Sequence, residues 1–130
     1  MFFAKSLPPR ALAEWWSDFI DRPMFDIIAM QDGVGCVRDI TPEDIPLYYK
    51  ELASVFSDNT IRFWNNVETF TIIKRGLPLI PAPLERIAQQ YENGRPFVER
   101  TITWEFGHFL GRQQVCKERY NAFRNWNLNS

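Results

Sequence analysis

Two glutamates, Glu68 and Glu105, each follow a short apolar run of the kind that forms a strand, and aromatic residues adjoin both. Neighbouring parallel strands lie ~4.8 Å apart, so two such glutamates at one level of a sheet would place their carboxyl groups roughly 5 to 9 Å apart. Paired carboxylates at these separations carry out retaining and inverting glycoside hydrolysis. We therefore take Glu68 and Glu105 as the candidate catalytic pair, with the stereochemical outcome open.

One carboxyl of such a pair must hold a proton, and burial against the rings of Trp104 or Phe106 would raise the pKa of Glu105 toward that role. The structural alternative is that both glutamates are exposed strand-end residues or ion-pair partners of nearby arginines. The arginines available for such pairs are Arg62, Arg100 and Arg112.

Other polar residues near the predicted strand ends are candidates for substrate binding. Gln31 and Asp32 begin a glycine-containing turn and could hold sugar hydroxyls, while the glycines permit backbone angles that other residues resist. His108 is the only histidine, so we expect it to hydrogen-bond substrate or backbone, and we predict no metal site. Asn66 is a further candidate, and Trp64 and Trp104 offer flat faces for stacking on a sugar ring.

A supersecondary pattern that occurs four times would position these residues: an apolar run, a turn, and an amphipathic stretch opened by proline or an acid. The run from Phe25 to Met30 is nearly all apolar, which is typical of a parallel strand covered on both faces. Thr41 and Pro42 then form a helix start. The Pro-rich segment 76–83 is expected to be an extended crossing without an element of its own. Strands are predicted at residues 1–4, 25–30, 60–67 and 98–104, and helices at 10–21, 42–56, 84–91 and 112–126.

Aromatic residues recur at helical spacing in the first and last predicted helices, and we interpret them as core packing. They are Trp15, Trp16 and Phe19 in the first helix and Tyr120, Phe123 and Trp126 in the last.

The alternation of strands and helices predicts a parallel α/β sheet with helices outside it, in a single domain over residues 1–130. Four units are half of a (β/α)8 TIM barrel, whose site lies at the C-terminal strand ends. Such a half-barrel leaves unpaired edges, so we expect a homodimer or a missing barrel half beside it. An open doubly wound sheet is the alternative, although the chain lacks a phosphate-cradling loop.

The composition of the chain limits the classes of binding partner that we expect. The 130 residues carry a net charge of −1 without a basic block, so nucleic acid and membrane partners are not expected. Cys36 and Cys116 are read as ordinary thiols, and no cofactor is predicted. The N-terminus lacks signal-peptide features, so a cytoplasmic location is expected if Met1 is the native start.

Four segments together resemble the C-terminal half of a bacterial barrel family, domain of unknown function 4434, which is similar to TIM-barrel glycoside hydrolases. The segments are FDIIAMQDGVG (25–35), RFWNNVETF (62–70), APLERI (82–87) and TITWEFGH (101–108). The resemblance implies a parallel barrel whose strand-end acids face a carbohydrate. It assigns to the pocket Gln31, Asp32, Glu68, Glu105 and His108.

Two hypotheses for function follow. The first is a carbohydrate-active, glycoside-hydrolase-like barrel segment that uses strand-end carboxylates. The second is a non-catalytic half-barrel that binds a glycan or a protein through the same surface.

Overall fold

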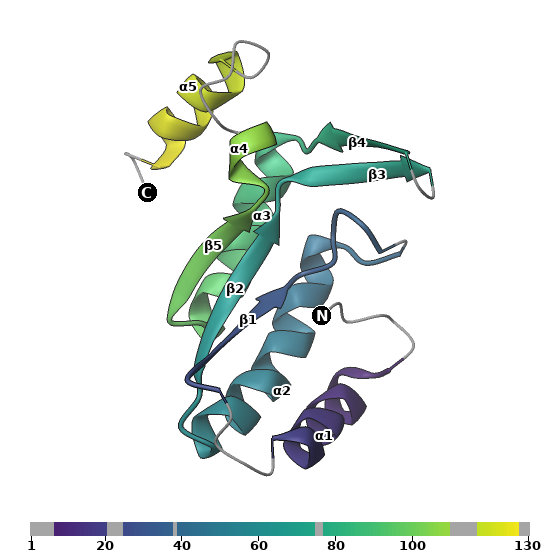
Figure 1. Cartoon of the computed structure of the whole chain (residues 1–130), viewed down its shortest axis with the longest axis vertical. Coiled ribbons are helices and arrows are strands. Elements are labelled where there is room, and N and C mark those ends of the chain that lie inside the picture. The colour runs from purple at the N-terminus through teal and green to yellow at the C-terminus, as the bar shows by residue number, and fades with distance from the viewer. Residues whose placement is uncertain (1–6, 21–24, 38, 75–76, 110–116, 128–130) are drawn as a thin grey trace.

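The chain folds around a parallel three-stranded sheet in the order β1, β2, β5, with helices packed against one of its faces (Figure 1). The computed structural model describes residues 7–20, 25–37, 39–74, 77–109 and 117–127. The mixed α/β fold with parallel strands is thereby confirmed, while the predicted strand at residues 1–4 lies outside the described residues. The sheet strands are β1 (Ile27–Gln31), β2 (Arg62–Glu68) and β5 (Arg100–Trp104), and the main helices are α1 (Pro9–Phe19), α2 (Ile45–Asp58), α3 (Leu84–Gly94) and α5 (Lys117–Asn127).

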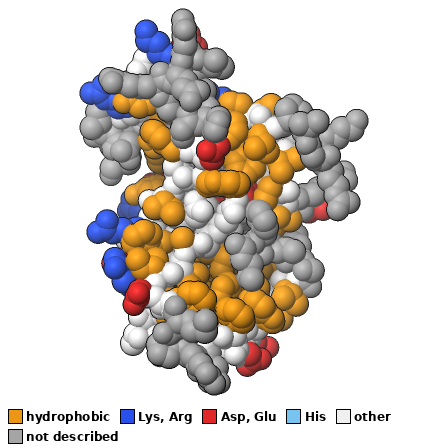
Figure 2. All heavy atoms as spheres, in the orientation of Figure 1, with side chains coloured by type: hydrophobic (Ala, Val, Ile, Leu, Met, Phe, Trp, Pro, Cys, Tyr) orange, Lys and Arg blue, Asp and Glu red, His pale blue; other side chains and the backbone are white. Residues whose placement is uncertain are grey.

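Burial alternates along the strands, because successive side chains point to opposite faces of a sheet. Ile28 and Met30 of β1 and Phe63 of β2 are buried on the helix-covered face. The other face is open, and hydrophobic side chains are exposed on it (Figure 2): Ile102 is 40% exposed and Trp104 is 45% exposed. The expectation that both faces are covered is therefore wrong for the described residues, because their helices pack on one side only. We call the uncovered side the open face.

The core lies between α1, α2 and the sheet. Tyr49 and Phe56 of α2 pack edge-on against Phe63, with ring centroids 5.0 and 4.9 Å from it, and Trp16 of α1 packs on Phe56. Aromatic pairs in this geometry contribute beyond the area that they bury. The interpretation of Trp16 as a core residue is thereby confirmed.

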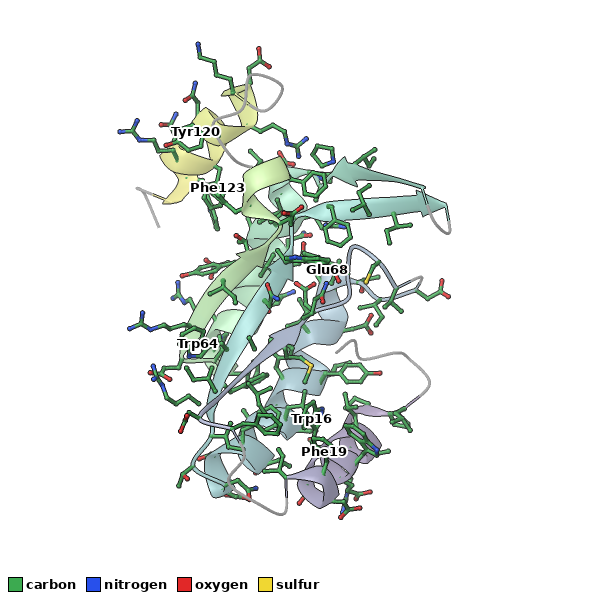
Figure 3. The ribbon with its side chains drawn as sticks, in the orientation of Figure 1. Trp16, Phe19, Trp64, Glu68, Tyr120 and Phe123 are labelled. Atoms are coloured by element: carbon green, nitrogen blue, oxygen red, sulfur yellow. The ribbon has the colours of Figure 1, made fainter. Side chains whose placement is uncertain are left out.

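Trp15 and Phe19 were also expected in the core, and this expectation is wrong. Phe19 is 53% exposed, and the two rings stack on each other with centroids 5.4 Å apart. They lie four residues apart on a surface-facing side of α1, whereas Leu12 and Trp16 form the side that is buried. Figure 3 shows Trp16 and Phe19 on this helix.

The Pro-rich segment after β2 is not a structureless crossing. It contains β4 (Leu77–Pro81), which pairs antiparallel with β3 (Phe70–Lys74). Proline is tolerated here because, among the described residues, β4 pairs with β3 alone, and a proline on an edge strand need not forfeit a ladder hydrogen bond. Phe70 is paired with Pro81, so this hairpin leaves β2 and returns to the start of α3.

Short helical turns occur beside three of the predicted boundaries. The Thr41–Pro42 start forms a 3-10 turn, and Asp44 Oδ2 accepts the Thr41 N–H at 2.8 Å before α2 begins. The segment after β5, expected to be a simple strand end, contains a short helix. These turns are η1 (Pro42–Asp44), η2 (Arg95–Phe97) and α4 (Phe106–Phe109).

Candidate functional site

Three neighbouring strands each deliver a carboxylate at the same edge of the sheet. Asp32 follows β1, Glu68 ends β2 and Glu105 follows β5. Glu68 pairs directly with Trp104 in the register of β2 and β5. Because the strands are parallel, all three residues lie at the C-terminal edge, which is where α/β folds place their sites.

The Glu68 side chain, labelled in Figure 3, is completely buried and accepts hydrogen bonds from three donors. Gln31 Nε2 lies 2.6 Å and the Cys36 thiol 2.9 Å from Oε1, and the Gly35 N–H lies 2.6 Å from Oε2. These donors come from β1 and the loop after it. Glu68 therefore joins the ends of two adjacent strands.

Asp32 is a second completely buried carboxylate, on the helix side of Glu68. Gln90 Nε2 of α3 donates to Asp32 Oδ2 at 2.6 Å, and the Val34 and Glu68 N–H groups donate to Oδ1 at 3.3 and 3.4 Å. Burial is the main cause that raises the pKa of Asp32 to about 7. The hydrogen bond from Gln90 lowers the pKa, the charge of Glu68 raises it, and the value of about 7 is the net result. Asp32 therefore holds its proton up to near-neutral pH.

Arg86 of α3 binds the backbone around these carboxylates. Its guanidinium donates to the carbonyl oxygens of Glu68 at 2.8 Å and Phe70 at 2.6 Å, and to the Thr71 hydroxyl at 2.9 Å. Burial lowers the pKa of Arg86 from its usual value, while the charges of Asp32 and Glu68 oppose that change. The arginine thus fixes the end of β2 and the start of β3 while facing two acids.

The backbone of the turn after β1 passes close to Glu68, and two glycines make this path possible. Gly33 adopts a φ of 75°, which confirms its need for a glycine. At Gly35 the reason is space, since an added Cβ would collide with the Phe70 carbonyl oxygen and lie 2.9 Å from Glu68 Oε2. Burial raises the pKa of the Cys36 thiol, so this cysteine is a protonated donor to Glu68. Cys116 lies outside the described residues.

Glu105 lies in a more open setting than Glu68. It is half-buried, and its backbone carbonyl accepts a hydrogen bond from the Thr69 hydroxyl at 3.3 Å. Trp104 beside it packs edge-on against Phe70, with ring centroids 5.6 Å apart, and leaves much of its ring on the open face. Glu105 and Trp104 are therefore accessible where Glu68 is not.

The remaining predicted residues divide into two groups. Asn66 is half-buried on the open face and is paired with Gln31, so the structure brings it to the carboxylates. The backbone of His108 lies in α4, and its side chain is outside the described part of the structure. Trp64 pairs with Arg100, four residues before Glu68 along β2, and is not brought to the carboxylates.

Two guanidinium groups instead lie over the Trp64 ring, at 5.5 Å (Arg62) and 5.8 Å (Arg100) from its centroid. Arg62 forms an ion pair with Glu99 at 2.8 Å. Glu68 accepts its side-chain hydrogen bonds from Gln31, Gly35 and Cys36, so the alternative in which it is an exposed strand-end residue or pairs with Arg62 is wrong. Arg112 lies outside the described residues.

Sequence reasoning missed Arg86 and Gln90. Both lie on α3, and Gln90 falls between Ile87 and Gly94 in the buried stripe of that helix. A glutamine within an apolar stripe is a detectable signal, because a buried amide needs a hydrogen-bond partner. The requirement at Gly35 arises from tertiary approach and has no local signal.

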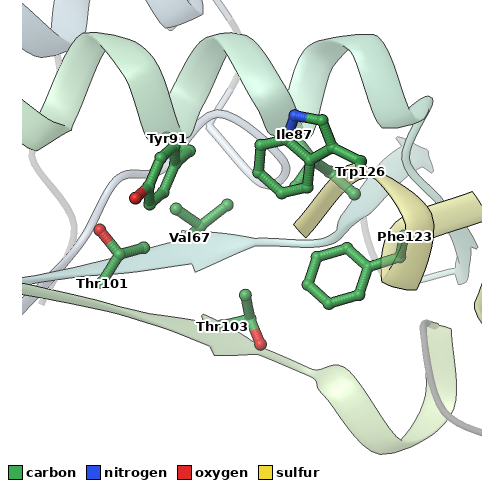
Figure 4. A pocket seen from close by; sticks show the side chains of 7 residues that line it. All are labelled: Val67, Ile87, Tyr91, Thr101, Thr103, Phe123 and Trp126. Atoms are coloured by element: carbon green, nitrogen blue, oxygen red, sulfur yellow. The ribbon is translucent and has the colours of Figure 1, made fainter. Parts of the chain in front are cut away.

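A small cavity of about 90 Å³ lies on the opposite, helix-covered side of the sheet, between β2, β5, α3 and α5 (Figure 4). Its lining is largely apolar, with the Thr101 and Thr103 side chains on the strand side. It does not reach the three carboxylates. The lining residues are Val67, Ile87, Tyr91, Thr101, Thr103, Phe123 and Trp126.

Within the described ranges, no group of three or more His, Cys, Asp or Glu side chains is arranged to hold a metal ion. No helix in the same ranges combines the length and the apolar character that crossing a membrane requires.

Comparisons with known proteins show what the fold resembles and which family the sequence matches. The structure is similar to a crystal structure described as a "putative alpha-L-fucosidase" from Bacteroides thetaiotaomicron, with a TM-score of 0.76 and 19% sequence identity. The match covers 92% of this chain and 37% of that protein, so the chain spans little more than a third of its length. No curated protein matches the sequence. The sequence profile of domain of unknown function 4434 matches residues 1–116, and the chain therefore belongs to the DUF4434 family.

Proposed function

We propose that the chain is a carbohydrate-active, glycoside-hydrolase-like barrel segment, whose chemistry is carried by the carboxylates at its C-terminal strand ends. The observation that carries the proposal is the delivery of Asp32, Glu68 and Glu105 by three adjacent parallel strands to one edge. The likeness of the fold to the Bacteroides protein supports it. The description of that protein makes an α-L-fucoside the first substrate to test.

Each carboxylate has a distinct role in this proposal. Glu68 accepts three hydrogen bonds, which favours an acceptor role as nucleophile or base. Glu105, beside the exposed Trp104 ring, is the acid that protonates the leaving oxygen. Asp32 lies behind Glu68 and supports it. Trp104 stacks on the sugar, and Asn66 binds a hydroxyl from the open face.

The proposed segment is completed by further β/α units that continue the sheet from its free edges as a TIM barrel. A parallel sheet is stable when both faces are covered, and here one is open. The 17 residues of the three strands present roughly 270 Å² of sheet, from the usual strand and residue spacings. A stable complex buries about 800 Å² per partner. Two copies stacked face to face through the sheet alone would bury too little surface for a stable dimer. We therefore favour added β/α units over a homodimer.

The test is hydrolysis of 4-nitrophenyl glycosides, beginning with the α-L-fucoside, by the full protein that carries this chain. E68Q and E105Q should each abolish turnover, because each keeps the shape of the side chain and removes its acid–base function. The matched control is E85Q, since Glu85 is exposed at the start of α3. Turnover retained in E68Q and E105Q would refute the catalytic assignment.

One observation favours a second function, a non-catalytic module that binds a glycan through the open face. Glu68 is completely buried, and its oxygens are engaged by donors of the protein itself. This is also what a purely structural carboxylate looks like. Glycan binding that survives both E68Q and E105Q, without turnover in the unmodified protein, would establish this function in place of the enzyme.

A further inference from the structure

Gln31 and Glu68 lie on the same side of the sheet, the open face, and their side chains are in contact. Both residues end their strands, and Gln31 pairs with Asn66, so Glu68 is its diagonal neighbour two positions further along β2. Diagonal neighbours on one face are within reach of long side chains. The Gln31 amide uses this reach to donate to Glu68 Oε1 at 2.6 Å, while Gln31 itself is only half-buried.

Of the other two donors to Glu68, the Gly35 N–H belongs to the backbone, and the Cys36 thiol belongs to a short side chain on a hydrogen-bonded turn. The Gly35 carbonyl accepts the Ile72 N–H of the hairpin at 2.8 Å, so the Gly35 N–H cannot leave Glu68 without breaking this second contact. The Cys36 and Val37 N–H groups both donate to the Gly33 carbonyl within the same turn. The Gln31 contact is made by a longer side chain, which can rotate about three bonds and move its amide away while β1 stays in place.

We propose that Gln31 is a positioning residue that controls access to Glu68, and that its amide moves from Glu68 to the substrate when a sugar binds. The exchange conserves hydrogen bonds. A sugar O–H donates to Glu68 Oε1 in place of the amide, and the freed Gln31 N–H donates to the oxygen of that hydroxyl. This inference rests on the proposed function, because it assumes that the ligand presents a sugar hydroxyl to Glu68.

Neighbouring groups agree with this assignment. Trp104 pairs with Glu68 from the side opposite to Gln31, so a ring stacked on Trp104 would bring its hydroxyls over the Gln31–Glu68 contact. Asp32 accepts a hydrogen bond from Gln90 behind the sheet and is not part of the exchange. Movement of Gln31 would therefore expose one carboxylate and leave the other buried.

The experiment measures the reactivity of Glu68 directly. The chain is treated with a water-soluble carbodiimide and glycine methyl ester, and amide formation at each carboxyl is followed by peptide mass spectrometry. Q31A should raise the labelling rate of Glu68 relative to Glu105 by roughly tenfold or more, the factor expected for loss of one hydrogen bond to a charged group. Q89A is the control, because Gln89 is an exposed glutamine on α3 that has no part in the proposed site; its Glu68 rate should stay at the wild-type value.

A Glu68 rate in Q31A within about twofold of the wild type, or an equal rise in Q89A, would overturn the proposal. If Q31A fails to fold, Q31N replaces it, since an amide one methylene shorter cannot span the same contact. Labelling requires no turnover, so its result is separate from the outcome of the glycoside assays. If the protein hydrolyses no glycoside but Q31A still raises the Glu68 labelling rate, the role of Gln31 in controlling access stands and the proposed function is refuted.

Discussion

Replacing Asp32 with Asn should remove most of a pH dependence of stability that this one carboxyl creates. Its pKa rises from the ordinary value of 3.8 to about 7 in the folded chain, chiefly through burial. Between these values the folded state binds a proton that the unfolded state has lost, so the free energy of unfolding falls as pH rises. At 1.36 kcal/mol per pH unit, the full loss is about 4 kcal/mol.

The wild-type chain should therefore lose stability steadily from about pH 4 to about pH 7, where the folded carboxyl must ionise without water. D32N cannot ionise, and its new amide can donate to Gln90 Oε1 if the Gln90 amide turns over, since that oxygen is buried without a partner in the described residues. Urea unfolding followed by tryptophan fluorescence across this range measures both profiles. Parallel profiles for the wild type and D32N would refute the reasoning, because another group would then carry the pH dependence.

Three further predictions concern stability. R86A should lower the free energy of unfolding by about 3 kcal/mol, because buried carbonyl acceptors lose a charged donor; R86K should recover only part of it, and an R86A midpoint equal to wild type would contradict the role of Arg86. G35A should cost about 2 kcal/mol or more and expose Glu68, since the added Cβ meets the carbonyl oxygen of Phe70; an unchanged denaturation midpoint would show that the turn relaxes. T103I should raise the thermal midpoint, with a gain of up to about 1 kcal/mol from filling the apolar cavity; a lowered midpoint would mean overpacking.

Much of the fold could be predicted because local signals agree with the tertiary structure. The apolar run at Phe25 to Met30 forms most of β1, and Thr41 with Pro42 marks the turn into α2. The hairpin could not be predicted in this way, because Pro78 and Pro81 argue against a strand in isolation. Its formation depends on β3 as a pairing partner, which is tertiary information.

The carboxylates of the candidate site could be predicted from the sequence, but the residues that bind them could not. Glu68 and Asp32 were identified from their places after strands, a rule that depends only on topology. Their burial and the donors that hold them were not identified, because the donors come from α3 and from a turn whose path is set by packing. For Trp64 the prediction was wrong. It is only four residues before Glu68 in the sequence, but along an extended strand this is roughly 13 Å, which is too far for both to contact one sugar ring.

The pairing of Phe70 with Pro81 has a consequence for how such a protein can change over evolution. Because the two ends of the β3–β4 hairpin meet directly after Glu68 and just before α3, residues can be added or removed between Lys74 and Leu77 without altering the span from β2 to α3. The length of the hairpin can therefore change without moving the carboxylates. The hairpin is where homologous chains can differ most in length beside an unchanged sheet edge, and where an inserted sequence can be tested without rebuilding the site.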